Sequence, residues 1–344
     1  MFPLGFPQTK RNELKDLTMR SKILLAFAAL ALVACTQEEV VDTPQTAITF
    51  SNAFIENSTH VTKIADPSVT KTSLEGFAVW GYRNETANVV FEGEIVTPVA
   101  GSEKWTYSST QYWIPYSKYY FAALAPIKST NWSLDLTGAN TYPGTVTFAN
   151  AEGTEDLLYS AVAVETPNLN TLLASGMSPV ELTFDHLLSK LKFTFVNGLD
   201  EDYISLVVRN ITMKVPADAT INLAIEKWWD NAVWTLVGTK KTTLDFGAAA
   251  EIAQGAQASS QNQRLTIPAD ESQEYEIEFI VEVKMDGKVV MEIPKTATLK
   301  GKAFKMGKSY NIKSTLTVEN LGLKPIEFEV VGVEGWIEGE DATF

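Results

Sequence analysis

A hairpin pattern near the C-terminal third of the chain limits the folds that it can adopt. From Tyr275 to Lys284 every second residue is apolar, and Asp286-Gly287 then leads into another apolar-rich run, Lys288 to Ile293. A period of two is typical of a β-strand with one buried face. The Asp-Gly pair favours a type I′ turn of two residues, so the sequence predicts an antiparallel hairpin. A hairpin of this kind needs another layer against its apolar face, which confines the chain to folds built on sheets.

Short strand-like runs of the same kind recur along most of the chain. They fall at 76–82, 88–96, 119–126, 145–148, 156–161, 180–184, 191–196, 204–208, 211–215, 220–225, 232–237, 264–268, 309–318 and 325–337. Helical periodicity is confined to one or two turns at 169–175, and residues 248–263 form a low-complexity stretch rich in Ala, Gln and Ser. The sequence therefore predicts an all-β protein with two β-sandwiches in series and a boundary near residue 180.

Composition and charge exclude several classes of protein. The chain has 344 residues, of which 45% are hydrophobic and 10% aromatic, so it can bury sizeable cores and is neither disordered nor a membrane-spanning protein. Its formal charge is -14. A surface with this charge repels nucleic acid and anionic lipid, and we exclude both as partners.

The N-terminal region predicts export. Residues 19–22 are a short basic segment, and the twelve apolar residues 23–34 that follow are too short to span a bilayer. We interpret residues 1–34 as an upstream extension, 1–18, followed by a lipoprotein signal peptide that starts at Met19. Loss of these residues removes five basic and two acidic side chains and leaves 23 basic against 40 acidic, a charge of -17.

Cys35 ends this leader and is the only cysteine, so the chain cannot form an internal disulfide. The sequence Leu32-Val33-Ala34-Cys35 resembles a bacterial lipobox, which predicts acylation of Cys35, for example with palmitate. Residues 35–46 are then an acidic tether, and their acidic start resembles the signal that directs lipoproteins of Gram-negative anaerobes to the cell surface. Each buried methylene of an acyl chain adds about 0.8 kcal/mol of membrane affinity, so a multiply acylated cysteine would anchor firmly in the outer membrane.

The first strand-like segment after the tether, residues 47–55, is followed by an accessible polar stretch. Ile48, Phe50 and Phe54 share one face at period two and predict a half-buried strand. Lys63 lies beyond it in a polar segment that a trypsin-like protease could cut. An ordinary edge strand and loop would give the same pattern.

Few residues have the chemistry that catalysis requires. The two histidines, His60 and His186, are isolated, and a single His between apolar residues is usually a core or turn residue. The sequence contains no phosphate loop, no zinc or calcium motif and no nucleophile elbow. The carboxylates are scattered at strand-alternating positions, although folding could still bring a glycosidase pair together. We therefore predict a protein that is not an enzyme and has no metal or cofactor.

A cluster of aromatic residues offers an alternative function. It comprises Trp105, Tyr107, Tyr112, Trp113, Tyr116, Tyr119, Tyr120 and Phe121. Exposed rings of this kind stack on sugars, so the chain could be a monomeric surface lipoprotein that binds glycans. Cross-strand packing in a sandwich core explains the same cluster, and also Trp228, Trp229 and Trp234, without a ligand.

Several motifs in a fixed order resemble the fimbrillins, the subunits of the type V pilus of Gram-negative anaerobes. In order they are the lipobox at Cys35, the strand 48–54 with Lys63 ahead of 65–68, Val79-Trp80-Gly81-Tyr82, Gln111-Tyr112-Trp113, Ala125-Pro126, Asp156-Leu157-Leu158-Tyr159, residues 184–193, Lys308-Ser309-Tyr310-Asn311-Ile312, Val333-Glu334-Gly335-Trp336 and the tail 341–344. The resemblance covers nearly the whole chain after Met19.

The resemblance implies two transthyretin-like β-sandwich domains in tandem, here residues 47–180 and 181–344. It also implies a lipoprotein precursor at the cell surface that becomes part of a fimbrium. A trypsin-like surface protease would cut after Lys63, where family members often have Arg, or after Lys71, and so release the strand that carries Ile48, Phe50 and Phe54.

In that family, a C-terminal strand of a neighbouring subunit then fills the vacated groove. Here the donor strand would lie near 325–344, with side chains such as Phe328, Val330, Val333 and Trp336. The expected partners are other copies or homologous pilus subunits, outer-membrane lipid through Cys35, and a host glycan or protein receptor for adhesion.

Overall fold

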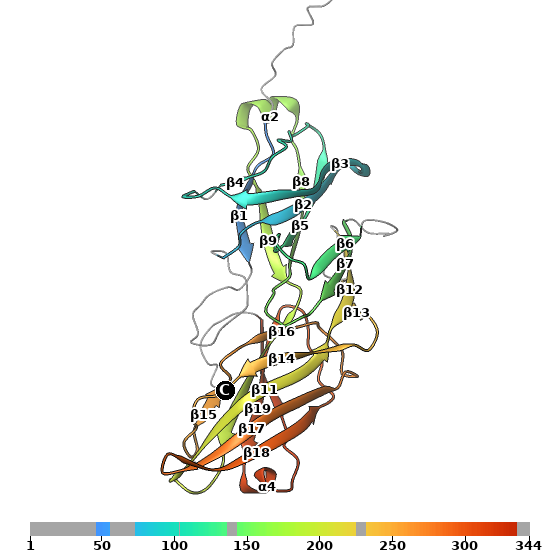
Figure 1. The fold of residues 1–344 in the computed structure, drawn as a ribbon. Helices are drawn as coiled ribbons and strands as arrows, with labels where there is room; N and C mark the ends of the chain where they lie inside the picture. Colours follow the sequence, from blue (N-terminus) through green and yellow to red (C-terminus); the bar gives the residue numbers. More distant parts are fainter. Residues whose placement is uncertain (1–45, 56–72, 103, 136–142, 225–231, 336–344) are drawn as a thin grey trace, which may run out of the picture. The chain divides into compact units, whose positions relative to one another are not determined.

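The computed structural model describes residues 46–55, 73–102, 104–135, 143–224 and 232–335. Thr46–Phe344 forms one compact unit, to which all of these residues belong (Figure 1). Nearly all of its regular structure is β-strand, which confirms the predicted all-β class. No helix in the described ranges combines the length and the apolar character needed to cross a membrane.

Seven strands form the largest sheet, which comes from residues 50–186. In order across the sheet they are β1 (Phe50–Ile55), β9 (Val180–His186), β8 (Leu158–Glu165), β5 (Lys118–Ala125), β2 (Phe77–Arg83), β3 (Glu85–Pro98) and β4 (Trp105–Thr106). The two end strands approach each other, because Ser51 of β1 forms a bridge with Lys104, the residue before β4. The sheet therefore curls around its own core, which contains Phe50, Phe77 and Phe121.

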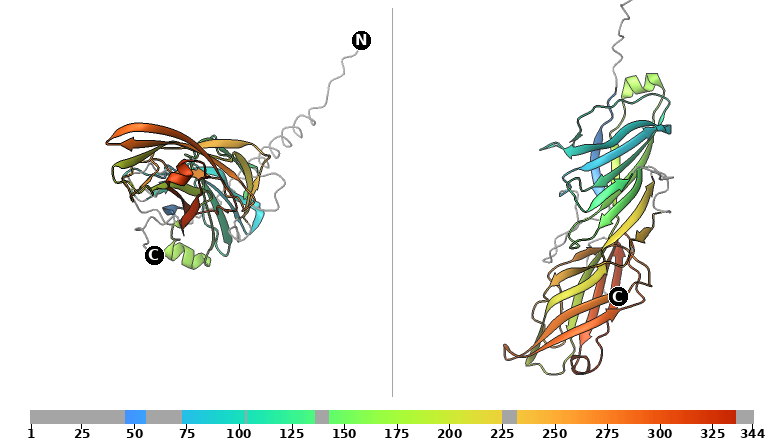
Figure 2. Two further views of the ribbon diagram at one scale, coloured as in Figure 1. Left: turned by 90° about the horizontal axis from the view of Figure 1, so that it is seen from below. Right: turned by 45° about the vertical axis from the view of Figure 1, so that its right-hand side comes forward.

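Two further sheets are built from the second half of the chain. One contains β15 (Gln257–Ser259), β10 (Ser189–Asn197), β19 (Lys308–Leu316) and β20 (Glu329–Gly335), with β16 (Arg264–Thr266) also paired to β10. The other contains β14 (Lys241–Gly247), β11 (Ile204–Pro216), β17 (Tyr275–Met285) and β18 (Lys288–Leu299). Figure 2 shows β17 and β18 as a long twisted pair of strands.

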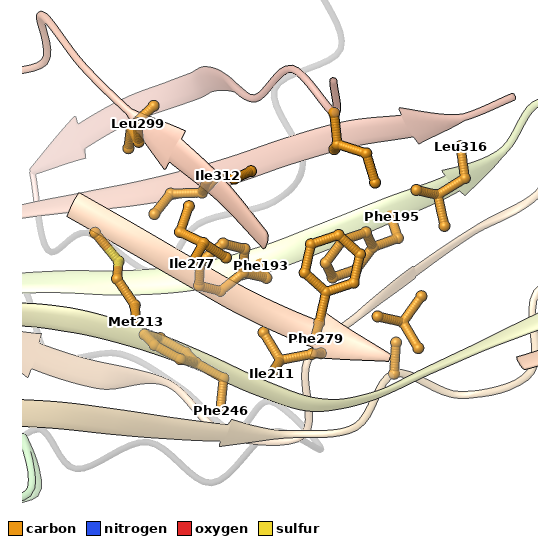
Figure 3. Packing of buried hydrophobic residues seen from close by; sticks show 14 of the residues in the cluster. Phe193, Phe195, Ile211, Met213, Phe246, Ile277, Phe279, Leu299, Ile312 and Leu316 are labelled. Carbon is orange, nitrogen blue, oxygen red and sulfur yellow. The ribbon is translucent and has the colours of Figure 1, made fainter. Parts of the chain in front are cut away.

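Alternating side chains of these two sheets are buried in a single cluster. Phe193 and Phe195 of β10 face Phe246 of β14 and Phe279 of β17, with ring centroids 4.7 Å apart for Phe193 and Phe246 and 5.3 Å apart for Phe195 and Phe279 (Figure 3). Along β17 and β19 mostly every second side chain is buried, and these side chains complete the apolar layer between the two sheets. The alternation in the sequence predicts this pattern.

A fourth sheet joins strands that are distant in sequence. Its order is β13 (Trp234–Leu236), β12 (Asp218–Ala224), β7 (Pro143–Ala149) and β6 (Trp132–Asp135). The pairing of β7 with β12 crosses residue 180, and β9, which begins at Val180, is paired with β8 and β1. The division into tandem transthyretin-like domains at 180 stays a prediction.

Two local predictions from the sequence are confirmed. The short helix at 169–175 is α2 (Leu169–Ser175); a second helix, α4 (Val318–Leu321), precedes β20. Asp286 and Gly287 both have positive φ, 48° and 73°, and Met285 pairs with Lys288. These values are those of a two-residue type I′ hairpin, and they explain why the turn sequence is Asp-Gly.

Candidate functional site

The strand predicted to be removable, β1, closes the seven-stranded sheet. It pairs in parallel with β9, so that Phe50 aligns with Val180 and Ile55 with Phe184. The amide of Val180 donates to the Thr49 carbonyl at 2.7 Å. A bulge between Ser51 and Phe54 shifts the register by one residue.

On its other side β1 is held by the segment that follows β4. The Ile48 amide donates to the Gln111 carbonyl at 2.8 Å, and the Trp113 amide donates to the Thr46 carbonyl at 2.9 Å. The Tyr107 hydroxyl donates to the Ile48 carbonyl at 2.6 Å. Thus the strand lies between β9 and the 104–113 segment, and its removal would expose a slot with backbone groups on both edges.

Two apolar side chains of this strand segment reach the core. Ile48 is 0% and Phe50 2% exposed. The Phe50 ring lies 5.8 Å from Phe77 and Phe91, 5.9 Å from Tyr107 and 6.1 Å from Phe121, measured between ring centroids. The side chain of Phe54 is outside the described residues. Burial of Ile48 and Phe50 is worth about 1.5–3 kcal/mol for each side chain.

Two polar residues stabilise the segment that covers β1. Burial raises the pKa of the Tyr107 hydroxyl, so it stays protonated and donates to Ile48. The hydroxyl and the amide of Ser108 donate to the Glu94 carboxylate at 2.7 and 2.8 Å. The hydroxyl hydrogen bond holds the pKa of Glu94 below its usual value. The sequence did not predict either role; Tyr107 was visible there only as a member of the aromatic cluster.

Within the segment 325–344, which was predicted to contain the donor strand, the structure has strand β20, and this strand ends the five-stranded sheet. It pairs antiparallel with β19, from Lys313 opposite Glu329 to Lys308 opposite Gly335, with a bulge between Tyr310 and Asn311. Its free edge faces away from β19 because no described strand pairs with it on that side. β20 is therefore hydrogen-bonded to a neighbouring strand along one edge only, whereas β1 lies between β9 and the 104–113 segment.

The segment that carries the predicted donor side chains packs partly into its own core. Phe328, just before β20, lies 5.7 Å from Phe193 and 6.0 Å from both Phe195 and Phe279, in edge-on geometry. Phe328 and Val330 are partly buried against the same cluster. The side chain of Val333 and the whole of Trp336 lie outside the described residues.

Three other predicted sites also lie outside the described residues. They are the lipidation site Cys35 and the cleavage sites Lys63 and Lys71. The described structure therefore does not show where these three residues lie relative to β1. The modification of Cys35 and the position of the cut stay predictions.

Most of the aromatic cluster is in the core. Trp113, Tyr119 and Phe121 are 4%, 1% and 0% exposed, whereas Tyr112 and Tyr116 are 43% and 78% exposed. Trp113 packs edge-on against Tyr119 at 4.7 Å. Cross-strand packing accounts for the buried rings, which leaves two exposed tyrosines for the glycan-binding alternative.

The described residues contain no cluster of three or more His, Cys, Asp or Glu side chains that could hold a metal ion. His186 is buried, and its Nδ1 lies 2.8 Å from Oδ2 of Asp156, also buried, in the neighbouring segment. This pair belongs to the packing between β8 and β9. His60 is outside the described residues.

Known proteins resemble this chain in sequence and in fold. The sequence model of a family described as fimbrillin-like matches residues 62–336. The structure of a fimbrial protein from Bacteroides vulgatus aligns with a TM-score of 0.55 and 16% sequence identity, covering 84% of this chain and 99% of that one. A candidate cell-adhesion protein from Bacteroides uniformis aligns with a TM-score of 0.47 and 16% identity, covering 86% and 99%. No curated protein sequence matches this chain.

Proposed function

The chain belongs to the fimbrillin-like family, and on that premise we propose that it is a structural subunit of a cell-surface pilus that acts in adhesion. In this proposal the precursor is an outer-membrane lipoprotein acylated at Cys35. A trypsin-like protease cuts after Lys63 or Lys71 and releases β1. The tail strand of a second subunit then takes the place of β1, and repetition extends the fibre.

The single observation that carries this proposal is the position of β1. It is the last strand of its sheet, and it lies outside the matched family region, which begins at residue 62. Its loss would uncover two strips of backbone groups and the pockets of Ile48 and Phe50. A slot with open edges and apolar pockets is suited to strand addition by another chain.

The energetics favour exchange only after the cut. An attached β1 is at high effective concentration and outcompetes a strand from solution. Once β1 has gone, each large apolar side chain that refills a pocket contributes about 1.5–3 kcal/mol. Each new ladder hydrogen bond contributes roughly 0.5–1.5 kcal/mol. The sum over several contacts gives a joint that dissociates very slowly, and a head-to-tail joint that does not close produces a filament.

The tail must leave its own sheet before it can be donated. β20 would give up its ladder with β19 and the ring contacts of Phe328. Both losses are offset if β20 forms a ladder with β9 and the 104–113 segment, and if its side chains fill the pockets of Ile48 and Phe50. The exchange therefore replaces one edge pairing by a strand with neighbours on both sides.

Limited trypsin digestion of the purified precursor tests the proposal. We expect a ladder of oligomers on size-exclusion chromatography and a new N-terminus at Ile64 or Thr72. The double variant Lys63→Gln/Lys71→Gln should remain monomeric under the same digestion. A synthetic peptide of residues 46–55 should block growth by refilling the slot, whereas a scrambled peptide should not. Cleavage at either lysine that yields only monomers would refute strand exchange.

The glycan-binding alternative makes a different prediction for Trp113. Because this ring is buried against Tyr119, a Trp113→Ala substitution should reduce stability through core packing. Loss of glycan binding by a monomer of unchanged stability would instead favour the alternative.

A further inference from the structure

One end of the seven-stranded sheet has no charged residues in the segments that form it. The segments are Thr46–Phe50, Tyr112–Ser117 and Thr166–Val180, which contain five, six and fifteen residues. None of them contains Asp, Glu, Lys or Arg, although 20% of all residues in the chain are charged. We call this region the uncharged pole.

Hydrogen bonds join the three segments into one surface. They run from the Trp113 amide to the Thr46 carbonyl at 2.9 Å, from the Thr166 hydroxyl to the Ile114 carbonyl at 2.7 Å, and from the Tyr116 amide to the Pro167 carbonyl at 3.1 Å. The first charges beyond the pole on β5 and β8 are Lys118 and Glu165, which stand opposite each other in the sheet. Figures 1 and 2 show α2 at this end of the sheet.

The uncharged pole exposes a group of large apolar side chains. They are Tyr112 at 43%, Ile114 at 46%, Tyr116 at 78%, Leu169 at 45% and Leu173 at 39% exposed. The two leucines lie four residues apart on α2, so they project from the same face of the helix, while Leu172 is buried. Tyr116 has φ 53°, in the left-handed region that a residue with a Cβ rarely adopts. Residues in such sparsely populated backbone conformations are enriched at functional sites.

The position of Thr46 indicates what the pole faces. Thr46 is the first residue of the compact unit and is part of the pole, and only ten residues separate it from Cys35. Whatever their conformation, those residues can span at most about 35–40 Å. If Cys35 carries lipid, Thr46 and the pole around it therefore stay within that distance of the membrane surface.

We propose that the uncharged pole rests on the lipid headgroup region of the membrane while the precursor is anchored through Cys35. This inference depends on the lipid anchor of the proposed function. Tyrosine suits such a surface, because its ring is apolar and its hydroxyl remains hydrated at the interface. The rest of the protein is strongly acidic and would be repelled by anionic lipid. An uncharged face avoids that repulsion and the desolvation of buried charge.

The contact would also orient the precursor. β1 starts at the pole and runs parallel to β9, whose first residue Val180 is also at the pole, so β1 leads away from it. The membrane would cover the start of β1 and leave its far end, at Ile55, turned away from the lipid.

The unique cysteine allows a direct test. The chain from Cys35 onward keeps the whole compact unit Thr46–Phe344 and can be coupled through Cys35 to a maleimide lipid in phosphatidylcholine vesicles. Amide hydrogen exchange in residues 110–117 and 167–177 should slow on coupling by roughly threefold to tenfold, equivalent to about 0.6–1.4 kcal/mol. The reference is the uncoupled protein mixed with the same vesicles.

A pair of variants makes the test specific. The triple variant Tyr116→Asn/Leu169→Ser/Leu173→Ser should lose this protection, because Asn tolerates the left-handed backbone and all three side chains are exposed. The control Val289→Ser/Val290→Ser/Met291→Ser removes three side chains of β18 that are 47%, 54% and 55% exposed, and it should keep the protection.

Three results would overturn the proposal. They are the absence of protection on vesicles, protection that persists in the triple variant, and protection that rises with protein concentration without lipid. The last would assign the pole to contact with a second copy. Because the lipid is attached chemically, these results do not depend on acylation in cells. Failure to incorporate labelled palmitate at Cys35 in cells would instead refute the anchor.

Discussion

β1 and β20 are each the last strand of a sheet. In the proposed assembly, β20 of one subunit takes the place of β1 in another. β1 aligns with β9 at few positions, and a bulge interrupts the pairing. Ile48, just before β1, and Phe50, its first residue, are nonetheless only 0% and 2% exposed. β20 has the longer ladder, with β19, but Phe328 and Val330 are only partly buried.

The difference shows how each strand is retained. β1 and the residues just before it are held by enclosed side chains and by hydrogen bonds on both sides, whereas β20 is held mainly by its ladder with β19. Exposed ladder hydrogen bonds open locally at lower free energy than a packed core does. We therefore expect β20 to detach without unfolding the protein, whereas β1 should leave only after the chain is cut. The substitutions below test this comparison, starting with the largest expected effect.

Phe50→Ala should have the largest effect on stability. Phe50 is 2% exposed and contacts four aromatic rings. Removing a buried phenyl ring costs about 3–5 kcal/mol in free energy of unfolding, because a cavity remains. Calorimetry or urea unfolding measures the loss, and Phe50→Leu should show less than half of it because most of the volume is kept. If Phe50→Ala costs no more than Phe328→Ala, the distinction between the strands is wrong.

The sequence predicted parts of the fold and two buried residues of the site, because the signals for them are local. The period-two pattern identified β17, and Asp286-Gly287 determined the turn that joins it to β18. The same rule identified Ile48 and Phe50 as buried. Each inference depends on residues close together in the chain, for which side-chain direction follows from the backbone period.

The pairing partners were not predictable in the same way. A period of two tells which side chains are buried but not which strand is the neighbour, so the parallel pairing of β1 with β9 and the bulge after Ser51 could not be foreseen. The low-complexity stretch 248–263 contains β15, which pairs with β10. An edge strand of this kind needs few apolar residues, and it therefore leaves a weak signal in the sequence.

Phe328→Ala should have an intermediate effect. The ring is partly buried and makes three edge-on contacts, so we expect a loss of about 1.5–3 kcal/mol in free energy of unfolding. Hydrogen exchange in β20 should accelerate more than in β10 or β17, because Phe328 fixes the start of the strand. Val318→Ala, at a side chain 67% exposed on α4, is the control and should change little. Equal acceleration in all strands would show that β20 does not open on its own.

Tyr107→Phe tests the hydrogen bond that holds β1 from its second side. The substitution removes the hydroxyl that donates to the Ile48 carbonyl and accepts from the Gln111 amide. The expected loss is about 0.5–1.5 kcal/mol, with little change in packing. Trypsin should then release β1 faster than in the unmodified chain. Tyr116→Phe removes a hydroxyl from a residue that is 78% exposed and should leave both the stability and the cleavage rate unchanged.

Glu94→Gln should have the smallest effect, and one that depends on pH. The hydrogen bond from the Ser108 hydroxyl lowers the pKa of Glu94 in the folded protein from its ordinary value of 4.5. A carboxyl group with a lowered folded pKa contributes stability above the unfolded pKa and loses it as the pH falls through the folded value. At pH 7 the substitution should therefore cost less than about 1 kcal/mol, since the group is near the surface. The difference between the two proteins in urea unfolding should shrink as the pH falls below 4.5.

Glu92→Gln, at an exposed position on the same strand, provides the control. A difference that stays constant with pH would show that the Glu94 charge does not help to hold the segment that covers β1.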